Sequence, residues 1–210
     1  MKFPNDDRLP TAATNVSASG AIAAPIQRPF VPRLPSTWPT LGPTADAAFV
    51  DVLHRLFVEG MLAELESVCS DVIANNAGSL QGRGHVIAVA MMSILESVSQ
   101  FASTGERQFL RIPAFVRSYF PPEYHPIADD LNDFYRNGLI HEWFMRKVAL
   151  LPGREPLTTQ SNGSPVLGLL TFKEGLTISI ERFLEELRTD ASLRDVAAIR
   201  YRTLQQDVRG

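Results

Sequence analysis

Apolar residues recur every three or four positions along much of this chain, and this spacing constrains its fold more than any other feature. The clearest stretch begins near Thr44 and ends near Val72. In an α-helix such residues fall on one face, so the stretch predicts a long amphipathic helix that packs against others. We expect Gly60 to kink or divide this helix, and Asn75-Asn76-Ala77-Gly78 to end it. Its apolar positions are Phe49, Val52, Leu53, Leu56, Phe57, Met61, Leu62, Leu65, Val68 and Val72.

Three further helical stretches follow. The second helix is expected from about Gly84 to Ala102, and its first half, His85 to Met92, is almost entirely apolar. A helix that is apolar on all sides belongs in the middle of a bundle. One or two shorter helices are expected from Phe109 to Phe120, ending at Pro121-Pro122. The third long helix is expected from about Pro126 to Val148.

The last part of the chain predicts a loop, a hairpin and a final helix. Short apolar runs at Val166 to Phe172 and Leu176 to Ile180 flank Lys173-Glu174-Gly175, which is typical of a β-hairpin. Helical spacing then continues from Ile180 to Ile199. The expected fold is therefore mainly α: an antiparallel helical bundle with a small β-hairpin before the C-terminal helix.

The first 44 residues differ in composition from the rest. They contain eight prolines, separated mainly by Ser, Thr and Ala, and show no helical or alternating pattern. Proline removes a backbone donor and fixes φ, so we expect a disordered Pro-rich tail over residues 1–44 and a helical domain over residues 45–210. The more apolar patch from Phe30 to Trp38 is expected either to fold back onto the domain or to bind a partner.

Composition narrows the class of protein. Hydrophobic residues make up 45% and charged residues 20%, as in ordinary globular domains. The net charge of -3 and pI of about 5.8 do not fit a protein that grips duplex nucleic acid along its length. We expect no membrane span and no secretory signal, hence a cytoplasmic protein. Cys69 is expected to be a buried, reduced thiol.

The polar residues of the third long helix form a compact group. Asp133, Asn137 and His141 are four residues apart, so they line one face, and the long side chain of Arg136 can reach the same place. Histidine transfers protons near neutral pH, and the arginine guanidinium matches phosphate. Because RNA carries its own nucleophile, the 2′-hydroxyl, these groups suffice to cleave it without a metal ion.

Arg136-Asn137-Gly138-Leu139-Ile140-His141 resembles the motif of the HEPN superfamily, in which an arginine is followed by four to six residues and a histidine. The likeness covers about residues 46 to 190, and Gly105 through Trp143 is similar to a group of bacterial HEPN-like proteins. It implies a homodimeric, metal-independent endoribonuclease that acts on RNA. Arg136 and His141 would be the catalytic pair, supported by Asn137. The resemblance also implies a toxin or defence effector with an antitoxin or regulatory partner.

Other interpretations of the same residues stay open. The pocket could hold RNA or a nucleotide without cutting it, or the helix face could serve only for dimerisation. Arg136 could pair with Asp133 while His141 lies on a solvated face. Glu96 is the only charged residue between Gly84 and Thr104. It either faces the bundle and holds Arg136, or lies on an exposed stripe with Ser93, Ser97 and Gln100. The four histidines lack metal-ligand spacing, and no cofactor motif occurs, so none is expected.

Overall fold

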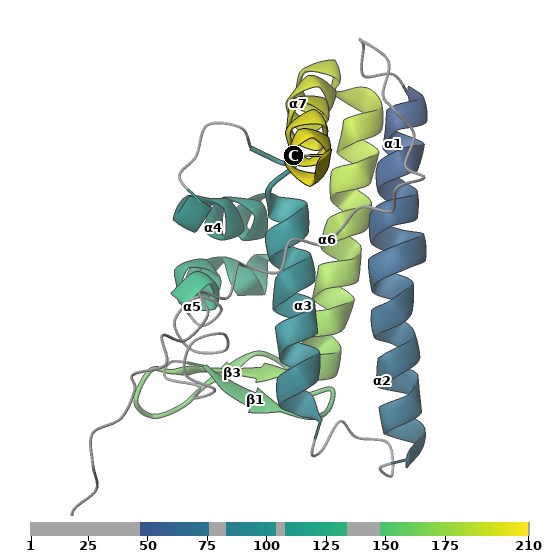
Figure 1. The fold of residues 1–210 in the computed structure, drawn as a ribbon. Coiled ribbons are helices and arrows are strands. Elements are labelled where there is room, and N and C mark those ends of the chain that lie inside the picture. Colours follow the sequence, from purple (N-terminus) through teal and green to yellow (C-terminus); the bar gives the residue numbers. More distant parts are fainter. Residues whose placement is uncertain (1–46, 76–82, 104–107, 134–147, 210) are drawn as a thin grey trace, which may run out of the picture. The chain divides into compact units, whose positions relative to one another are not determined.

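The computed structural model describes residues 47–75, 83–103, 108–133 and 148–209 of the chain. These residues lie within the larger of the two units of the chain, Leu34–Gly210, and are mainly helical (Figure 1). The predicted tail and most of the predicted third long helix lie outside the described residues. The elements are α1 (Ala47–His54), η1 (Arg55–Leu62), α2 (Ala63–Asn75), α3 (Gly84–Ser99), α4 (Gln108–Tyr119), η2 (Pro122–Ile127), α5 (Ala128–Asp133), β1 (Ala149–Leu151), β2 (Thr158–Thr159), β3 (Pro165–Gly168), α6 (Leu169–Thr189) and α7 (Ala191–Arg209).

The first three elements form one continuous helical rod. The middle one, η1, is a π-helix that contains Gly60, and the N–H of Ala63 reaches back five residues to the carbonyl of Val58. Gly60 was expected to kink or divide the helix, and instead it lies in a stretch of wider turns. The described part of the rod reaches Asn75, and the rest of its predicted end, residues 76–78, lies outside the described residues.

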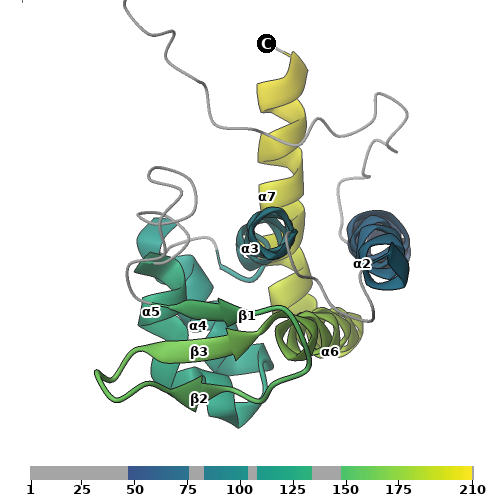
Figure 2. The same cartoon turned by 90° about the horizontal axis from the view of Figure 1, so that it is seen from below.

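The second predicted helix, α3, lies in the middle of the bundle. Ile87, Met91, Leu95 and Val98 are all buried, and the helix packs against α2, α4 and α6. Seen along their axes, α2, α3 and α6 stand at the corners of a triangle (Figure 2). The apolar first half of this helix therefore occupies the central position that the sequence predicts.

Aromatic side chains join α4 and η2 to α6. Phe115 of α4 meets Phe183 of α6 edge to face, with ring centroids 5.8 Å apart. Phe120 packs in the same way against Tyr124 of η2 at 5.5 Å. Such rings bury large apolar surfaces and prefer these geometries. The helix α4 ends at Tyr119, before Pro121 and Pro122, as predicted.

The hairpin predicted around Lys173-Glu174-Gly175 is wrong, because these residues lie inside α6. Gly175 is not a turn residue: a Cβ added there would lie 3.3 Å from the Tyr124 ring, so the glycine lets helix and ring approach closely. The apolar runs on either side of it form the buried face of one helix.

A small three-stranded sheet precedes α6, with strand order β1-β3-β2. β1 pairs in parallel with β3, and β2 pairs antiparallel with β3 through a turn in which the Gln160 N–H donates to the Ser164 carbonyl at 2.8 Å. In that turn Gly163 has φ of 84°, which favours glycine. The antiparallel pair thus lies earlier in the chain than predicted. The sheet lies at one end of α3, which contacts β1 (Figure 1).

The single C-terminal helix that the sequence predicts consists of two helices, α6 and α7. Asp190 separates α6 from α7, and its side chain accepts a hydrogen bond of 3.0 Å from the Leu193 N–H, which is the geometry of a helix N-cap. Arg194 of α7 donates to the Leu187 and Arg188 carbonyls at the end of α6. These contacts let the chain turn back and pack α7 against α6.

Candidate functional site

The central residues of the predicted site, Arg136, Asn137 and His141, lie outside the described residues. Two members of the predicted group, Asp133 and Glu96, are described, together with the elements on both sides of the motif. The place where the chain enters and leaves this segment is therefore defined, at the end of α5 and at the start of β1.

The entry side is held by α5 and the short 3-10 helix before it. Ala128 and Leu131 are fully buried, and α5 packs against α4 and η2. Arg117 of α4 bonds Asp129 of α5 at 2.5 Å. Asp133, the last residue of α5, is half-buried and has an interaction partner. The last described residue before the motif is thus attached to a firmly packed helix.

The exit side is held by the sheet. Val148 is buried and lies in no helix, and Ala149 opposite Val166 begins the parallel pairing of β1 with β3. The motif helix was predicted to extend to about Val148. Val148 itself is not helical, because the strand pairing takes up the backbone hydrogen bonds of the residues that follow. The rest of that predicted helix, residues 134–147, lies outside the described residues.

Glu96 lies on α3 and is half-buried, as are Ser93, Ser97 and Gln100. The two serine hydroxyls donate to carbonyls one turn earlier, each at 2.8 Å. Gln100 accepts a hydrogen bond from Arg200 of α7. Glu96 also has an interaction partner. The stripe is therefore partly covered. The predicted contact of Glu96 with Arg136 lies outside the described residues.

Two of the described histidines, His54 and His125, and the cysteine have local contacts. His54 of α1 lies 3.5 Å from Glu59, and the His125 ring contacts the Phe120 carbonyl at 3.1 Å. Cys69 is fully buried, as predicted, and burial raises the pKa of its thiol. In the part of the chain that the structure describes, no three His, Cys, Asp or Glu residues are grouped to hold a metal ion. None of the described helices is both long and apolar enough to cross a membrane.

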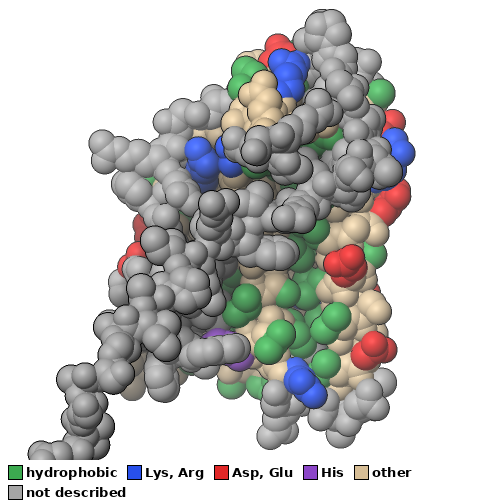
Figure 3. Space-filling model, in the orientation of Figure 1, with side chains coloured by type: hydrophobic (Ala, Val, Ile, Leu, Met, Phe, Trp, Pro, Cys, Tyr) green, Lys and Arg blue, Asp and Glu red, His purple; other side chains and the backbone are tan. Residues whose placement is uncertain are grey.

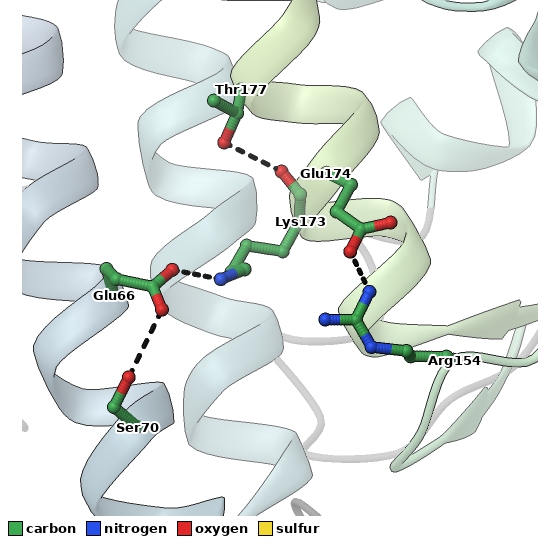
Figure 4. A network of polar contacts seen from close by, with 6 residues as sticks. All are labelled: Glu66, Ser70, Arg154, Lys173, Glu174 and Thr177. Carbon is green, nitrogen blue, oxygen red and sulfur yellow. Dashed lines mark hydrogen bonds and ion pairs between the residues drawn. The ribbon is translucent and has the colours of Figure 1, made fainter.

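A polar network that the sequence did not predict joins α6 to α2 and to the residues after β1 (Figure 4). Lys173 of α6 forms an ion pair with Glu66 of α2, which also accepts a hydrogen bond of 3.1 Å from Ser70. Arg154 pairs with Glu174, the next residue of α6. The hydrogen bond from Lys173 lowers the pKa of the Glu66 carboxyl, and burial opposes this effect.

Stability should therefore depend on the charge of Glu66. Its pKa is lower in the folded chain, so its contribution is complete above the unfolded value of about 4.3 and is lost as the pH falls through the folded value. At pH 7 we expect Glu66→Gln to cost less than about 1 kcal/mol, because Glu66 is 60% exposed. The difference from the parent should shrink towards pH 3. Urea unfolding at both pH values measures it, with Glu64→Gln on the same helix as the control, and a cost that grows in acid contradicts the assignment.

Comparisons with protein-family models, with curated proteins and with solved structures found no match for this chain.

Proposed function

We propose that this protein is a metal-independent endoribonuclease of the HEPN type, which cleaves RNA through the 2′-hydroxyl. The observation that carries the proposal is the sequence Arg136-Asn137-Gly138-Leu139-Ile140-His141, which begins three residues after the anchored end of α5. A motif attached to a packed helix has the fixed starting point that positioned catalytic groups need. The mainly helical fold is compatible with this family.

The proposed chemistry needs three groups. His141 removes the proton from the 2′-hydroxyl or protonates the leaving 5′-oxygen, because imidazole exchanges protons near neutral pH. Arg136 stabilises the charge that develops on the phosphate, since its guanidinium offers a planar fork of donors. Asn137 orients the phosphate. Cleavage breaks the bond from phosphorus to the 5′-oxygen and leaves a 2′,3′-cyclic phosphate, or the 3′-phosphate formed from it, and a 5′-hydroxyl.

Two acidic residues would support this centre. Glu96 on α3 and Asp133 at the end of α5 are both half-buried, and a carboxylate beside Arg136 would fix the direction of its guanidinium. We propose further that two copies of the chain form a homodimer, which would bring two motifs together. A cytoplasmic toxin or defence effector, restrained by an antitoxin or other regulatory protein, is the biological role that fits such an activity.

The proposal is tested by incubating the purified chain with mixed single-stranded RNA in EDTA. We expect the parent to cleave RNA, to spare DNA of the same sequence, and to leave cyclic phosphate ends. His141→Ala should lower the rate by about 100-fold to 10,000-fold, the usual contribution of a general acid or base.

The matched control is His54→Ala, which removes an imidazole of α1 that lies 3.5 Å from the carboxylate of Glu59 in η1. It should cleave like the parent. If the folded parent leaves RNA intact, the enzyme proposal fails, and measurable RNA affinity that Arg136→Ala abolishes would then indicate a binding module. Equal cleavage by parent and His141→Ala would remove His141 from the site.

A further inference from the structure

Apolar side chains are exposed on two neighbouring helices of the bundle. Val68 of α2 is 50% exposed and Val86 of α3 is 57% exposed, and exposed apolar residues are informative where they gather in one patch. Met61, Val72 and Val89 are only half-buried. Space-filling atoms show hydrophobic side chains gathered over α3 and the strip between α3 and α2 (Figure 3). We call these five residues the α2–α3 face.

Helical spacing connects the members of this face. Met61, Leu65, Val68 and Val72 are separated by four, three and four residues and form one stripe along the first rod. Val86 and Val89 lie one turn apart on α3, which packs beside α2 (Figures 1 and 2). Leu65 in this stripe is buried, whereas Val68 is exposed. The α2–α3 face therefore lies at the edge of the hydrophobic core, where the described residues cover it only partly.

We propose that residues 34–45 of the same chain occupy the α2–α3 face, with Trp38 and Leu34 as the apolar anchors. This segment carries no charge, contains three prolines, and precedes α1 almost directly. It belongs to the same unit of the chain, Leu34–Gly210, as the helices that form the face. An uncharged, proline-rich segment loses little conformational entropy on docking, and its apolar side chains match an apolar surface.

The length of the segment fits the distance it has to cover. Trp38 lies nine residues before Ala47, and Leu34 lies thirteen before it, which gives about 28 Å and 40 Å in an extended proline-rich conformation. Along the rod, Met61 lies about 21 Å from Ala47 and Val68 about 32 Å, at 1.5 Å per helical residue. A chain that turns back at the start of α1 can therefore place Trp38 near Met61 and Leu34 near Val68.

A segment of the same chain also has a concentration advantage over a separate molecule. Attachment to α1 through a short linker gives an effective concentration in the millimolar range. Docking in this way therefore does not depend on the concentration of the protein. This property separates the proposed occupant from a second copy of the chain.

The emission of Trp38 tests the proposal in the full chain. In a Trp143→Phe background Trp38 is the only tryptophan. We expect its emission to be blue-shifted and weakly quenched by acrylamide, and to stay so on dilution. The double variant Val68→Lys, Val86→Lys should shift the emission to the red and strengthen quenching. Ile199→Lys on α7, where the side chain is 53% exposed, is the matched control and should change neither.

Three results would overturn the proposal. Solvent-like emission of Trp38 in the parent, or no response to the double substitution, would show that residues 34–45 do not cover the face. A red shift on dilution would assign the face to a second copy. If Trp143→Phe disturbs the fold, subtracting the spectrum of Trp38→Phe from that of the parent isolates Trp38 without changing Trp143. None of these readouts depends on RNA cleavage.

Discussion

Replacing Gly168 by alanine is expected to destabilise the fold by about 3 kcal/mol, near the upper end of the usual cost of overpacking. Gly168 is buried where β3 passes into α6. A Cβ at this position would lie 2.1 Å from the carbonyl oxygen of Glu155 and 2.7 Å from its nitrogen. Because these are backbone atoms, they cannot rotate away as the end of a side chain can.

Relief of this contact requires movement of β3 or of the residues after β1. Gly168 pairs with Leu151 in the parallel register, so either movement strains the sheet that holds the exit of the motif segment. Urea unfolding followed by circular dichroism measures the loss. The control is Gly60→Ala, where the nearest atom is 3.4 Å away and alanine should be neutral or favourable by up to about 1 kcal/mol. An unchanged midpoint for Gly168→Ala would contradict the close contact.

Replacing Arg136 by lysine is expected to lower RNA cleavage by about 100-fold to 1,000-fold, as the loss of one stabilising donor does in other enzymes. This prediction rests on the proposed function. Lysine keeps the positive charge but presents a single ammonium group, which cannot bind two phosphate oxygens side by side as a guanidinium does. The loss should therefore appear in the chemical step, which single-turnover cleavage at saturating RNA measures.

The matched control is Arg117→Lys, since Arg117 is a half-exposed residue of α4 that pairs with Asp129. It should cleave at the parental rate. Arg117→Lys should also unfold at the parental urea concentration, because it keeps the positive charge that pairs with Asp129. The unfolding of Arg136→Lys is measured beside it, so that a loss of fold is distinguished from a loss of chemistry. Parental cleavage by Arg136→Lys would mean that the guanidinium fork has no part in the reaction.

Local patterns account for what the sequence predicted correctly. The helices α3 and α4 follow from apolar spacing and from the prolines after Tyr119, all of which act within a few residues. Gly175 misled the prediction because a glycine in a hairpin turn and a glycine that admits a neighbouring ring have the same sequence signal. What decided between them was Tyr124, far away in the sequence.

Long-range contacts account for what could not be predicted. The parallel pairing of β1 with β3 joins separate parts of the chain and has no local signature. The ion pair between Glu66 and Lys173 spans 107 residues. For the candidate site, the motif could be recognised because it is contiguous. The half-buried position of Glu96 depends on how α3 packs, which periodicity alone leaves undecided.

The π-helix between α1 and α2 changes the phase of the first rod. Leu53 and Leu65 are both fully or almost fully buried, yet twelve residues of ordinary α-helix would place them a third of a turn apart. The buried residues Phe57 and Leu62 are five residues apart, and this wider step makes up the difference. Loss of one residue here would let the stretch form an ordinary α-helix, because eleven α-helical residues place Leu53 and Leu65 only about 20° apart. A homologue that lacks one residue between Leu53 and Leu65 should therefore have a regular α-helix at this place and keep the same buried stripe.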